Sequence, residues 1–172
     1  MSDFMISDEN LLLKKEVRRF AVNELEPHAS EIDSLGKFPR KNIEGLVELG
    51  LTGLTIDEKY GGVGGTSKQL AIVAEEIARG CGSTSVIFLA HLSLCTQFIN
   101  TYGTEEQKIK YLSDLVAAKS IGAFGLTEPD AGSDSARITT SLREVGSGYV
   151  LNGTKLYTTN AKEADIFIII AN

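Results

Sequence analysis

The residues best suited to chemistry in this 172-residue chain lie close together in residues 124–134, with the sequence FGLTEPDAGSD. This stretch is typical of a strand that runs into a loop of small and polar residues. Gly132 permits a sharp turn or a close approach of the backbone to a ligand. The hydroxyls of Thr127 and Ser133, with the neighbouring amides, can hydrogen-bond a planar heterocycle or an anionic group. We interpret the stretch as a ligand-binding loop, and an ordinary turn after a strand is the alternative.

Two carboxylates in this stretch, Glu128 and Asp134, have the chemistry of an acid/base pair. Carboxylates beside Pro and Gly more often accept hydrogen bonds from loop amides, so we expect a capping role and assign no catalytic residue. The lone His91 lies in an apolar segment, where we expect a hydrogen-bonded core residue rather than a ligand or a base.

Other patterns that carry chemistry are weak. Cys81 and Cys95 form no CxxC pair, so we expect reduced, partly buried thiols and no metal site. Residues 60–65, YGGVGG, have neither the Gly-Lys-Ser/Thr ending of a phosphate loop nor the GxGxxG spacing of a dinucleotide site. We interpret them as a flexible turn.

Composition excludes several classes of protein. The net charge of −6, from 17 Lys and Arg against 23 Asp and Glu, has the wrong sign for binding nucleic acid. The longest unbroken apolar run, residues 166–171, is too short to cross a bilayer, so we expect no membrane span. Residues 1–10 lack the basic and apolar regions of a signal peptide, which predicts a cytoplasmic location.

Helical periodicity fills the chain as far as residue 120. We expect helices from an N-cap at Ser7 to a bend or end near Pro27, from Pro39 to Gly50, from the capping box of Thr66 and Gln69 to Gly80, over residues 84–102, and from the capping box of Thr104 and Gln107 onward. The segment 84–102 is apolar nearly all round, as expected at the centre of a bundle. The residues expected to face the core in the other helices include Ile43, Leu46, Val47, Val73, Ile77, Ile109, Leu112, Leu115 and Val116.

Turn signals and alternating patterns dominate residues 121–172. We expect strands over residues 121–126 and 138–142, a turn over 144–148, a hairpin over 149–157 around Asn152-Gly153, and a fully buried strand over 166–170. So few strands with a bare apolar edge predict an incomplete domain. The chain therefore divides into an all-α bundle, residues 1–120, and a partial β-domain, residues 121–172, which makes the fold class α+β.

Several separate motifs, in the same order, give this chain a family resemblance. FGLTEPDAGSD, preceded by GTEEQKIKYL and followed by NGTKLYTTNAKEAD, resembles the amino-terminal and middle parts of the acyl-CoA dehydrogenase family, as does EKYGGVGG. AHLSLC and IGAFGLTEP are most similar to the short-chain, butyryl-CoA type. The resemblance implies an amino-terminal helical domain, an incomplete antiparallel β-barrel-like middle domain, and a homotetrameric parent protein.

The resemblance also implies a cofactor, FAD, and the residues that contact it. By motif match, Leu126 and Thr127 would lie near the flavin ring system, and Ser133 would point toward the acyl-CoA. The implied cofactor-binding residues are Phe124, Leu126, Thr127, Gly132, Ser133, Tyr157, Thr158 and Thr159. Tyr157 stands where many members carry Trp, and this chain has no Trp. An aromatic ring there still supplies a stacking face.

The family reaction, as the resemblance implies it, oxidises an acyl-CoA to a trans-2-enoyl-CoA and passes electrons to electron-transfer flavoprotein. The base is a Glu that lies beyond the part matched here, and no residue of this chain corresponds to it. We therefore expect the parent protein to be the enzyme and this chain alone to be inactive. Two alternatives remain open: an acyl-CoA oxidase-like flavoenzyme, and a non-catalytic module that binds a partner.

Overall fold

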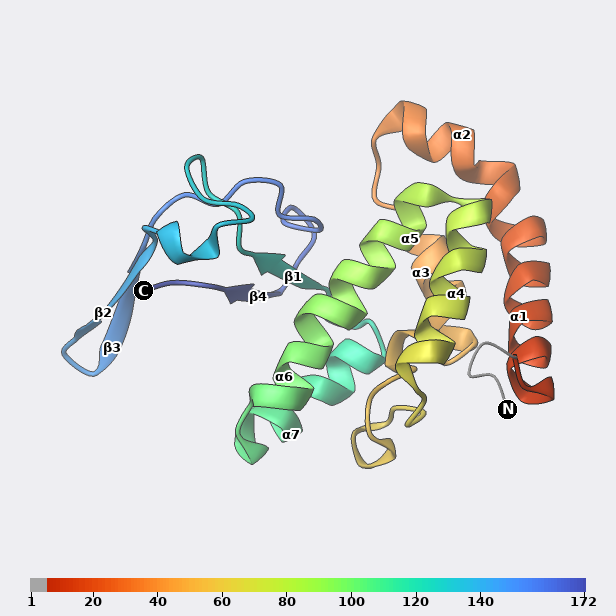
Figure 1. The fold of residues 1–172 in the computed structure, drawn as a ribbon, viewed down its shortest axis with the longest axis horizontal. Coiled ribbons are helices and arrows are strands. Elements are labelled where there is room, and N and C mark those ends of the chain that lie inside the picture. The colour runs from red at the N-terminus through yellow and green to blue at the C-terminus, as the bar shows by residue number, and fades with distance from the viewer. Residues whose placement is uncertain (1–5) are drawn as a thin grey trace.

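The structure, a computed structural model, describes residues 6–172. The first half of the segment examined for a signal peptide therefore lies outside the described residues. A bundle of helices forms one part of the molecule, and two small sheets with long loops form the other (Figure 1). The helices are α1 (Asp8–Phe20), α2 (Glu26–Leu35), α3 (Arg40–Glu48), α4 (Ser67–Gly80), α5 (Gly82–Leu89), α6 (Gln97–Tyr102) and α7 (Glu105–Val116). The strands are β1 (Gly122–Gly125), β2 (Ser141–Val145), β3 (Gly148–Asn152) and β4 (Ile166–Ile169).

The starts of α1, α4 and α7 are those that the sequence predicts, whereas α3 begins one residue after Pro39 and α5 begins at Gly82, two residues before the expected start. The Ser7 hydroxyl accepts a hydrogen bond from the Asn10 N–H, and α4 and α7 begin with complete capping boxes at Thr66 and Thr104. These caps satisfy N–H groups that have no partner within the helix. Of the two outcomes expected near Pro27, the helix bends there rather than ends (Figure 1). A π-helical turn, Ala21–Leu25, joins α1 to α2, and Pro27 lies in the first turn of α2.

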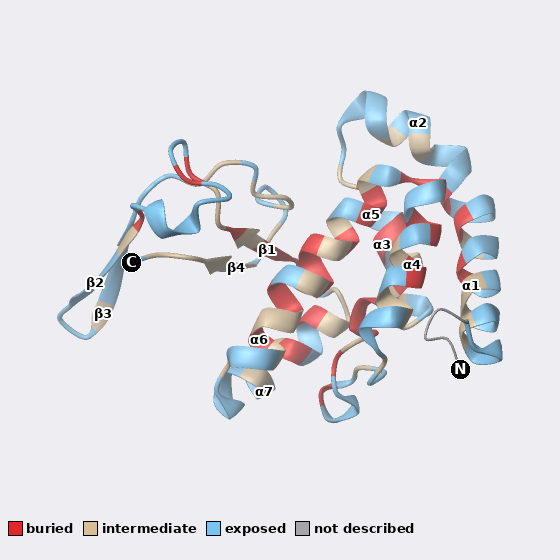
Figure 2. Ribbon diagram, in the orientation of Figure 1, coloured by how far each residue is buried: buried red, intermediate tan, exposed pale blue. Residues whose placement is uncertain are grey.

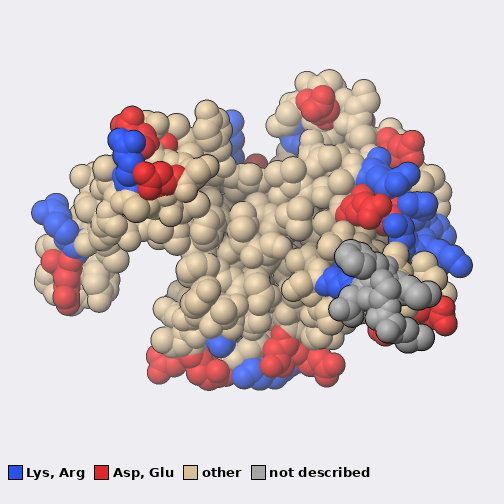
Figure 3. All heavy atoms as spheres, viewed as in Figure 1, with Lys and Arg blue, Asp and Glu red and all other residues tan. Residues whose placement is uncertain are grey.

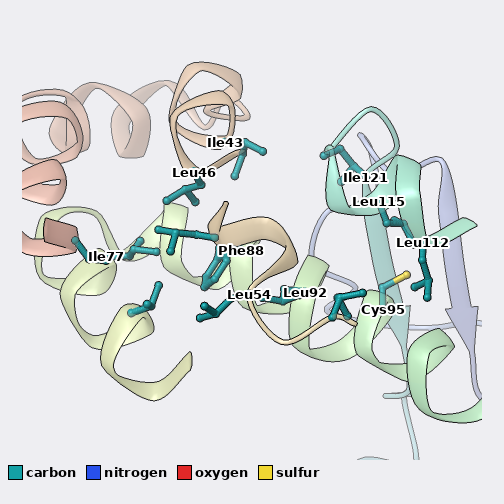
Figure 4. Packing of buried hydrophobic residues seen from close by; sticks show 14 of the residues in the cluster. Ile43, Leu46, Leu54, Ile77, Phe88, Leu92, Cys95, Leu112, Leu115 and Ile121 are labelled. Atoms are coloured by element: carbon teal, nitrogen blue, oxygen red, sulfur yellow. The ribbon is translucent and has the colours of Figure 1, made fainter. Parts of the chain in front are cut away.

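The core lies between α1, α3, α4 and the long helix formed by α5, a π-helical segment (Ala90–Thr96) and α6 (Figures 2 and 4). Leu46, Ile77, Phe88 and Leu92 are fully buried there. Leu112 and Leu115 of α7 are also buried, as predicted, but the Ile109 side chain is 66% exposed. That prediction was wrong because the helix turns Ile109 outward and packs Tyr111 against the core cluster instead.

Gly82–Tyr102 is the one continuous helix, within residues 6–172, that is long and apolar enough to cross a membrane. Half of its most apolar stretch is buried inside the protein. The central helix of a soluble bundle passes the same test of length and composition, so this finding is weak support for a span.

The β part contains two separate strand pairs among the described residues. β1 and β4 are parallel, with Gly122 opposite Ile166, and β2 and β3 form an antiparallel hairpin, with Val145 opposite Gly148. The α+β class is therefore confirmed, but the expected antiparallel arrangement holds only for the hairpin. Parallel pairing arises because residues 126–165 cross over between β1 and β4. The last strand is not fully buried, since the ring of Phe167 is 44% exposed.

The hairpin turn does not lie at Asn152-Gly153. The chain reverses at residues 146–147, where Gly146 has a φ of +63°, so strand 138–142 shifts to Ser141–Val145 and the expected turn 144–148 shortens. Gly153 lies against Thr140, and a Cβ there would be 2.2 Å from the Thr140 hydroxyl. This contact directs residues 153–157 away from the hairpin and toward the loop after β1.

Candidate ligand-binding site

The loop that follows β1 and the segment around Tyr157 lie side by side, as the assignment of both to one site requires. The Leu156 N–H donates to the Thr127 carbonyl at 2.8 Å, and Lys155 Nζ donates to the Leu126 carbonyl at 2.9 Å. Two successive carbonyls of the loop are thus held by two successive residues of the second segment. The spacing between Leu126, Thr127 and the residues after Leu156 is therefore fixed by hydrogen bonds.

Glu128 anchors this arrangement from below the surface. Its carboxylate accepts hydrogen bonds from the Thr139 N–H at 2.7 Å and the Thr140 N–H at 2.9 Å, and from both threonine hydroxyls. It also pairs with Lys155 Nζ at 2.7 Å. The hydrogen bond from Lys155 is the main reason that the pKa of the Glu128 carboxyl lies well below its usual range.

These contacts confirm the capping role expected for Glu128. The carboxylate is only 4% exposed, ionised and fully engaged with backbone and side-chain donors, so it is unsuited to act as a general base. Asp134 is exposed and precedes a short 3-10 turn, Ser135–Arg137. One carboxylate is buried and the other faces solvent, and the two form no acid/base pair.

The predicted ligand residues differ in exposure. Leu126 and Thr127 are half-buried, whereas Gly132 and Ser133 are exposed on the loop. Phe124 is half-buried on β1, and its ring lies 5.9 Å from that of Phe98 on α6, so it packs against the helical part.

The segment Tyr157 to Thr159 projects from the protein in a constrained turn. The Tyr157 side chain is 90% exposed, and Thr158 and Thr159 are half-buried beside it. Tyr157 has a φ of +54°, a left-handed backbone conformation that residues other than glycine rarely adopt. A solvent-exposed aromatic face next to two hydroxyls is suited to stacking on a planar ligand.

His91 is a core residue, as predicted. Its Nε2 lies 2.9 Å from the Leu115 carbonyl, and its Nδ1 accepts a hydrogen bond from the Gly122 N–H at 3.0 Å. These partners assign the proton to Nε2. Burial lowers the pKa of His91, so the neutral ring joins the long helix to the start of β1.

No group of three or more His, Cys, Asp or Glu residues within residues 6–172 is placed to hold a metal ion. Cys81 and Cys95 are both buried free thiols, as the sequence predicts, and burial raises the pKa of Cys95 to about 11. With that raised pKa, Cys95 is not a reactive nucleophile at neutral pH.

The sequence interpretation missed three residues that build the site: Lys155, Thr140 and Asn160. Lys155 and Thr140 hold Glu128, and Asn160 ties the Tyr157 turn to the helices. None carries a local signal, because each acts through a partner that is distant in sequence.

A pocket of about 500 Å³ lies beside the Tyr157 turn, with Ile87, Thr158 and Asn160 in its wall. On the face shown in Figure 3, most charged residues lie at the periphery, and the middle of the face is formed mainly by other residues.

The fold is α+β, and the paired loops form a candidate ligand site. Comparison with known families identifies it further: the N-terminal domain of acyl-CoA dehydrogenases matches residues 7–119, and the middle domain of the same family matches residues 123–172. The chain therefore belongs to the acyl-CoA dehydrogenase family.

Individual relatives agree with this assignment. The chain is 45% identical to a short-chain-specific acyl-CoA dehydrogenase of Clostridium acetobutylicum, over 98% of this chain and 45% of that protein. Butyryl-CoA dehydrogenase from Megasphaera elsdenii is 37% identical with a TM-score of 0.89, over 99% of this chain and 45% of that one. A chain from the solved electron transferring flavoprotein of Acidaminococcus fermentans is 36% identical with a TM-score of 0.91, over 99% of this chain and 45% of that one. The chain thus spans less than half the length of these relatives.

Proposed function

We propose that the chain forms the amino-terminal domain, residues 1–120, and the first part of the β-barrel-like middle domain, residues 121–172, of an FAD-dependent acyl-CoA dehydrogenase. The parent enzyme oxidises a short-chain acyl-CoA to the trans-2-enoyl-CoA and passes electrons to electron-transfer flavoprotein. The single observation that carries this proposal is the hydrogen-bonded pairing of the loop after β1 with the segment at Tyr157. The similarity to a short-chain-specific relative supports the substrate class.

The residues present fit one side of a flavin. Tyr157 offers an exposed aromatic face, and the half-buried hydroxyls of Thr127, Thr158 and Thr159 offer donors and acceptors around it. FAD, when bound, supplies the two-electron acceptor. In this proposal Leu126 and Thr127 bind the ring system, and Tyr157, Thr158 and Thr159 orient it. Phe124, Gly132 and Ser133 complete the lining, and Ser133 also contacts the acyl-CoA.

In this proposal neither carboxylate of the loop after β1 serves as the base of the reaction. Glu128 is fully hydrogen-bonded and ion-paired, and Asp134 is exposed outside that buried network. We therefore expect no dehydrogenation of butyryl-CoA by the purified chain in the presence of FAD and an artificial electron acceptor. Turnover above a reaction without protein would contradict this expectation.

Flavin binding tests the proposal directly. The purified chain is incubated with FAD, desalted and examined for a retained visible flavin band that is shifted from that of free FAD. Tyr157→Ala should weaken retention, whereas the matched control Tyr149→Ala, on the exposed hairpin, should not. Equal retention by both variants would show that Tyr157 does not contact the ring.

The parent protein is proposed to be a cytoplasmic homotetramer whose redox partner is electron-transfer flavoprotein. The likeness to a chain from a solved electron transferring flavoprotein supports that partner. Co-sedimentation of the flavin-loaded parent protein with electron-transfer flavoprotein tests the partner, and the sedimentation coefficient of the parent protein alone tests the tetramer.

A further inference from the structure

The helical and β parts meet at Gly122, the first residue of β1. Its N–H donates to His91 Nδ1 at 3.0 Å, and its carbonyl accepts from Asn160 Nδ2 at 3.0 Å. A Cβ at Gly122 would lie 2.6 Å from the Cys95 side chain, so only glycine permits this approach. Both backbone polar groups of Gly122 are therefore satisfied by side chains from other elements, and Asn160 supplies one of them.

The same Asn160 amide reaches a second element. Nδ2 also donates to the Ile87 carbonyl of α5 at 3.1 Å. Both amide protons are thus used on carbonyls that lie 73 and 38 residues away in sequence. Asn160 Oδ1, in contrast, is buried without a hydrogen-bond partner. An unpaired buried oxygen is unfavourable. The two hydrogen bonds that Nδ2 donates must outweigh this cost, so they fix the position of the Asn160 side chain.

The backbone around Asn160 is itself constrained. Asn160 has a φ of +69° and Tyr157 a φ of +54°, so two left-handed residues enclose Thr158 and Thr159. The Asn160 carbonyl accepts from the N–H groups of Glu163 and Ala164, both at 2.9 Å. Residues other than glycine keep a left-handed backbone conformation only where surrounding contacts impose it, and such positions are often found at functional sites.

The Tyr157–Thr159 segment is therefore attached at both ends. Lys155 and Leu156 join its start to the loop after β1, and Asn160 joins its end to α5 and β1. We propose that Asn160 is a positioning residue, whose side-chain amide holds the Tyr157 ring and the Thr158 and Thr159 hydroxyls in place for the flavin. This inference rests on the proposed function, since it assumes that the segment contacts FAD.

The test compares Asn160→Asp and Asn160→Gly with Thr52→Val. Asp keeps the shape but replaces the Nδ2 group, which donates both hydrogen bonds, by an acceptor oxygen that faces the two carbonyls. Gly keeps the left-handed backbone but removes the amide. Thr52→Val is the matched control, because it removes a buried hydrogen bond from the Thr52 hydroxyl to the Val116 carbonyl, 2.7 Å long, within the helical part.

The first measurement needs no cofactor. Backbone amide NMR of the chain should show one set of Thr158 and Thr159 signals in the wild type and in Thr52→Val. In Asn160→Asp these signals should shift or split, and the Ala164 amide should exchange with solvent about tenfold faster, as expected from the loss of hydrogen bonds. Unchanged signals and exchange in Asn160→Asp would overturn the inference, whatever the result with FAD.

The second measurement is FAD affinity, with the shape of the bound flavin band. Both Asn160 variants should bind FAD about tenfold more weakly with an altered band, while Thr52→Val binds as the wild type does. If the wild-type chain and both Asn160 variants bind alike, the positioning role is wrong. If the wild-type chain retains no FAD although the NMR result holds, the flavin role proposed for this chain fails, and Asn160 is shown to order the segment only.

Discussion

The helical part and the β part satisfy their backbone polar groups in different ways. In the helical part, α1, α4 and α7 begin with local side-chain caps such as Thr66 and Thr104, and an apolar core lies beneath. In the β part, buried polar side chains hold backbone groups that no strand reaches: Glu128 accepts from Thr139 and Thr140, and Lys155 donates to Leu126. Stability should therefore depend mainly on packing in the first part and to a larger extent on ionisation in the second.

The largest expected effect is on packing in the helical part. Phe88 is fully buried between α3, α4 and the neighbouring turns, so Phe88→Ala should lower the free energy of unfolding by about 3–5 kcal/mol. The control Phe167→Ala removes a ring that is already partly exposed on β4 and should cost less than about 1.5 kcal/mol. Urea unfolding followed by circular dichroism measures both. Equal losses would mean that the Phe167 ring is packed as tightly as the Phe88 ring.

Next in size is the loss of the buried ion pair in the β part. Glu128→Gln leaves the Lys155 ammonium buried without its partner and should cost about 3 kcal/mol. The control Glu16→Gln breaks an exposed pair with Arg19 within α1 and should cost less than about 0.5 kcal/mol.

The pKa of Glu128 lies below the ordinary 4.5, so the stabilisation that this carboxyl gives is present above that pH. It should be lost as the pH falls from 4.5 toward the folded-state pKa. Glu128→Gln should remove this part of the acid sensitivity, as measured by urea unfolding at a series of pH values. An unchanged pH profile would contradict the ionisation argument.

A smaller effect is expected from His91, in mildly acidic solution. Because burial lowers the pKa of His91 below 6.5, the unfolded state binds a proton first, and stability should decline as the pH falls below 6.5. The slope should approach about 1.4 kcal/mol per pH unit. His91→Gln should abolish the slope, and His28→Gln, at an exposed site, should leave it unchanged. Thermal or urea unfolding at a series of pH values measures it.

The smallest expected effect concerns the caps. Thr104→Ala removes the hydroxyl that accepts from the Gln107 N–H at the start of α7 and should cost about 1 kcal/mol. Thr104→Ser keeps the hydroxyl and should be nearly neutral. A cost for serine as large as that for alanine would point to the methyl group rather than the cap.

Local signals predicted the helical part well. Capping boxes and helical periodicity depend on residues three or four positions apart, so Thr66, Thr104 and the buried Leu112 were predicted from the sequence alone. Ile109 was misassigned because periodicity does not say where a partner surface ends. The Asn152-Gly153 hairpin was wrong for a different reason: two long-range contacts, Gly153 with Thr140 and Lys155 with Glu128, outweigh the local turn preference.

The candidate site shows the same division. The FGLTEPDAGSD loop and the Tyr157 motif could be recognised from the sequence, but their distance from one another could not. That distance is set by Lys155, Leu156 and Asn160, whose partners lie 27 to 73 residues away. Residues that act through such distant partners leave no periodic pattern in the sequence.

The exposure of Tyr157 gives the protein an optical reporter of its own. The chain has five tyrosines and no tryptophan, so its ultraviolet emission comes from tyrosine alone. A flavin stacked on the Tyr157 ring would accept excitation energy from it and quench part of that emission. Ligand arrival at the turn can therefore be followed in unlabelled protein, and the quenched fraction that disappears in Tyr157→Phe is the share contributed by this one ring.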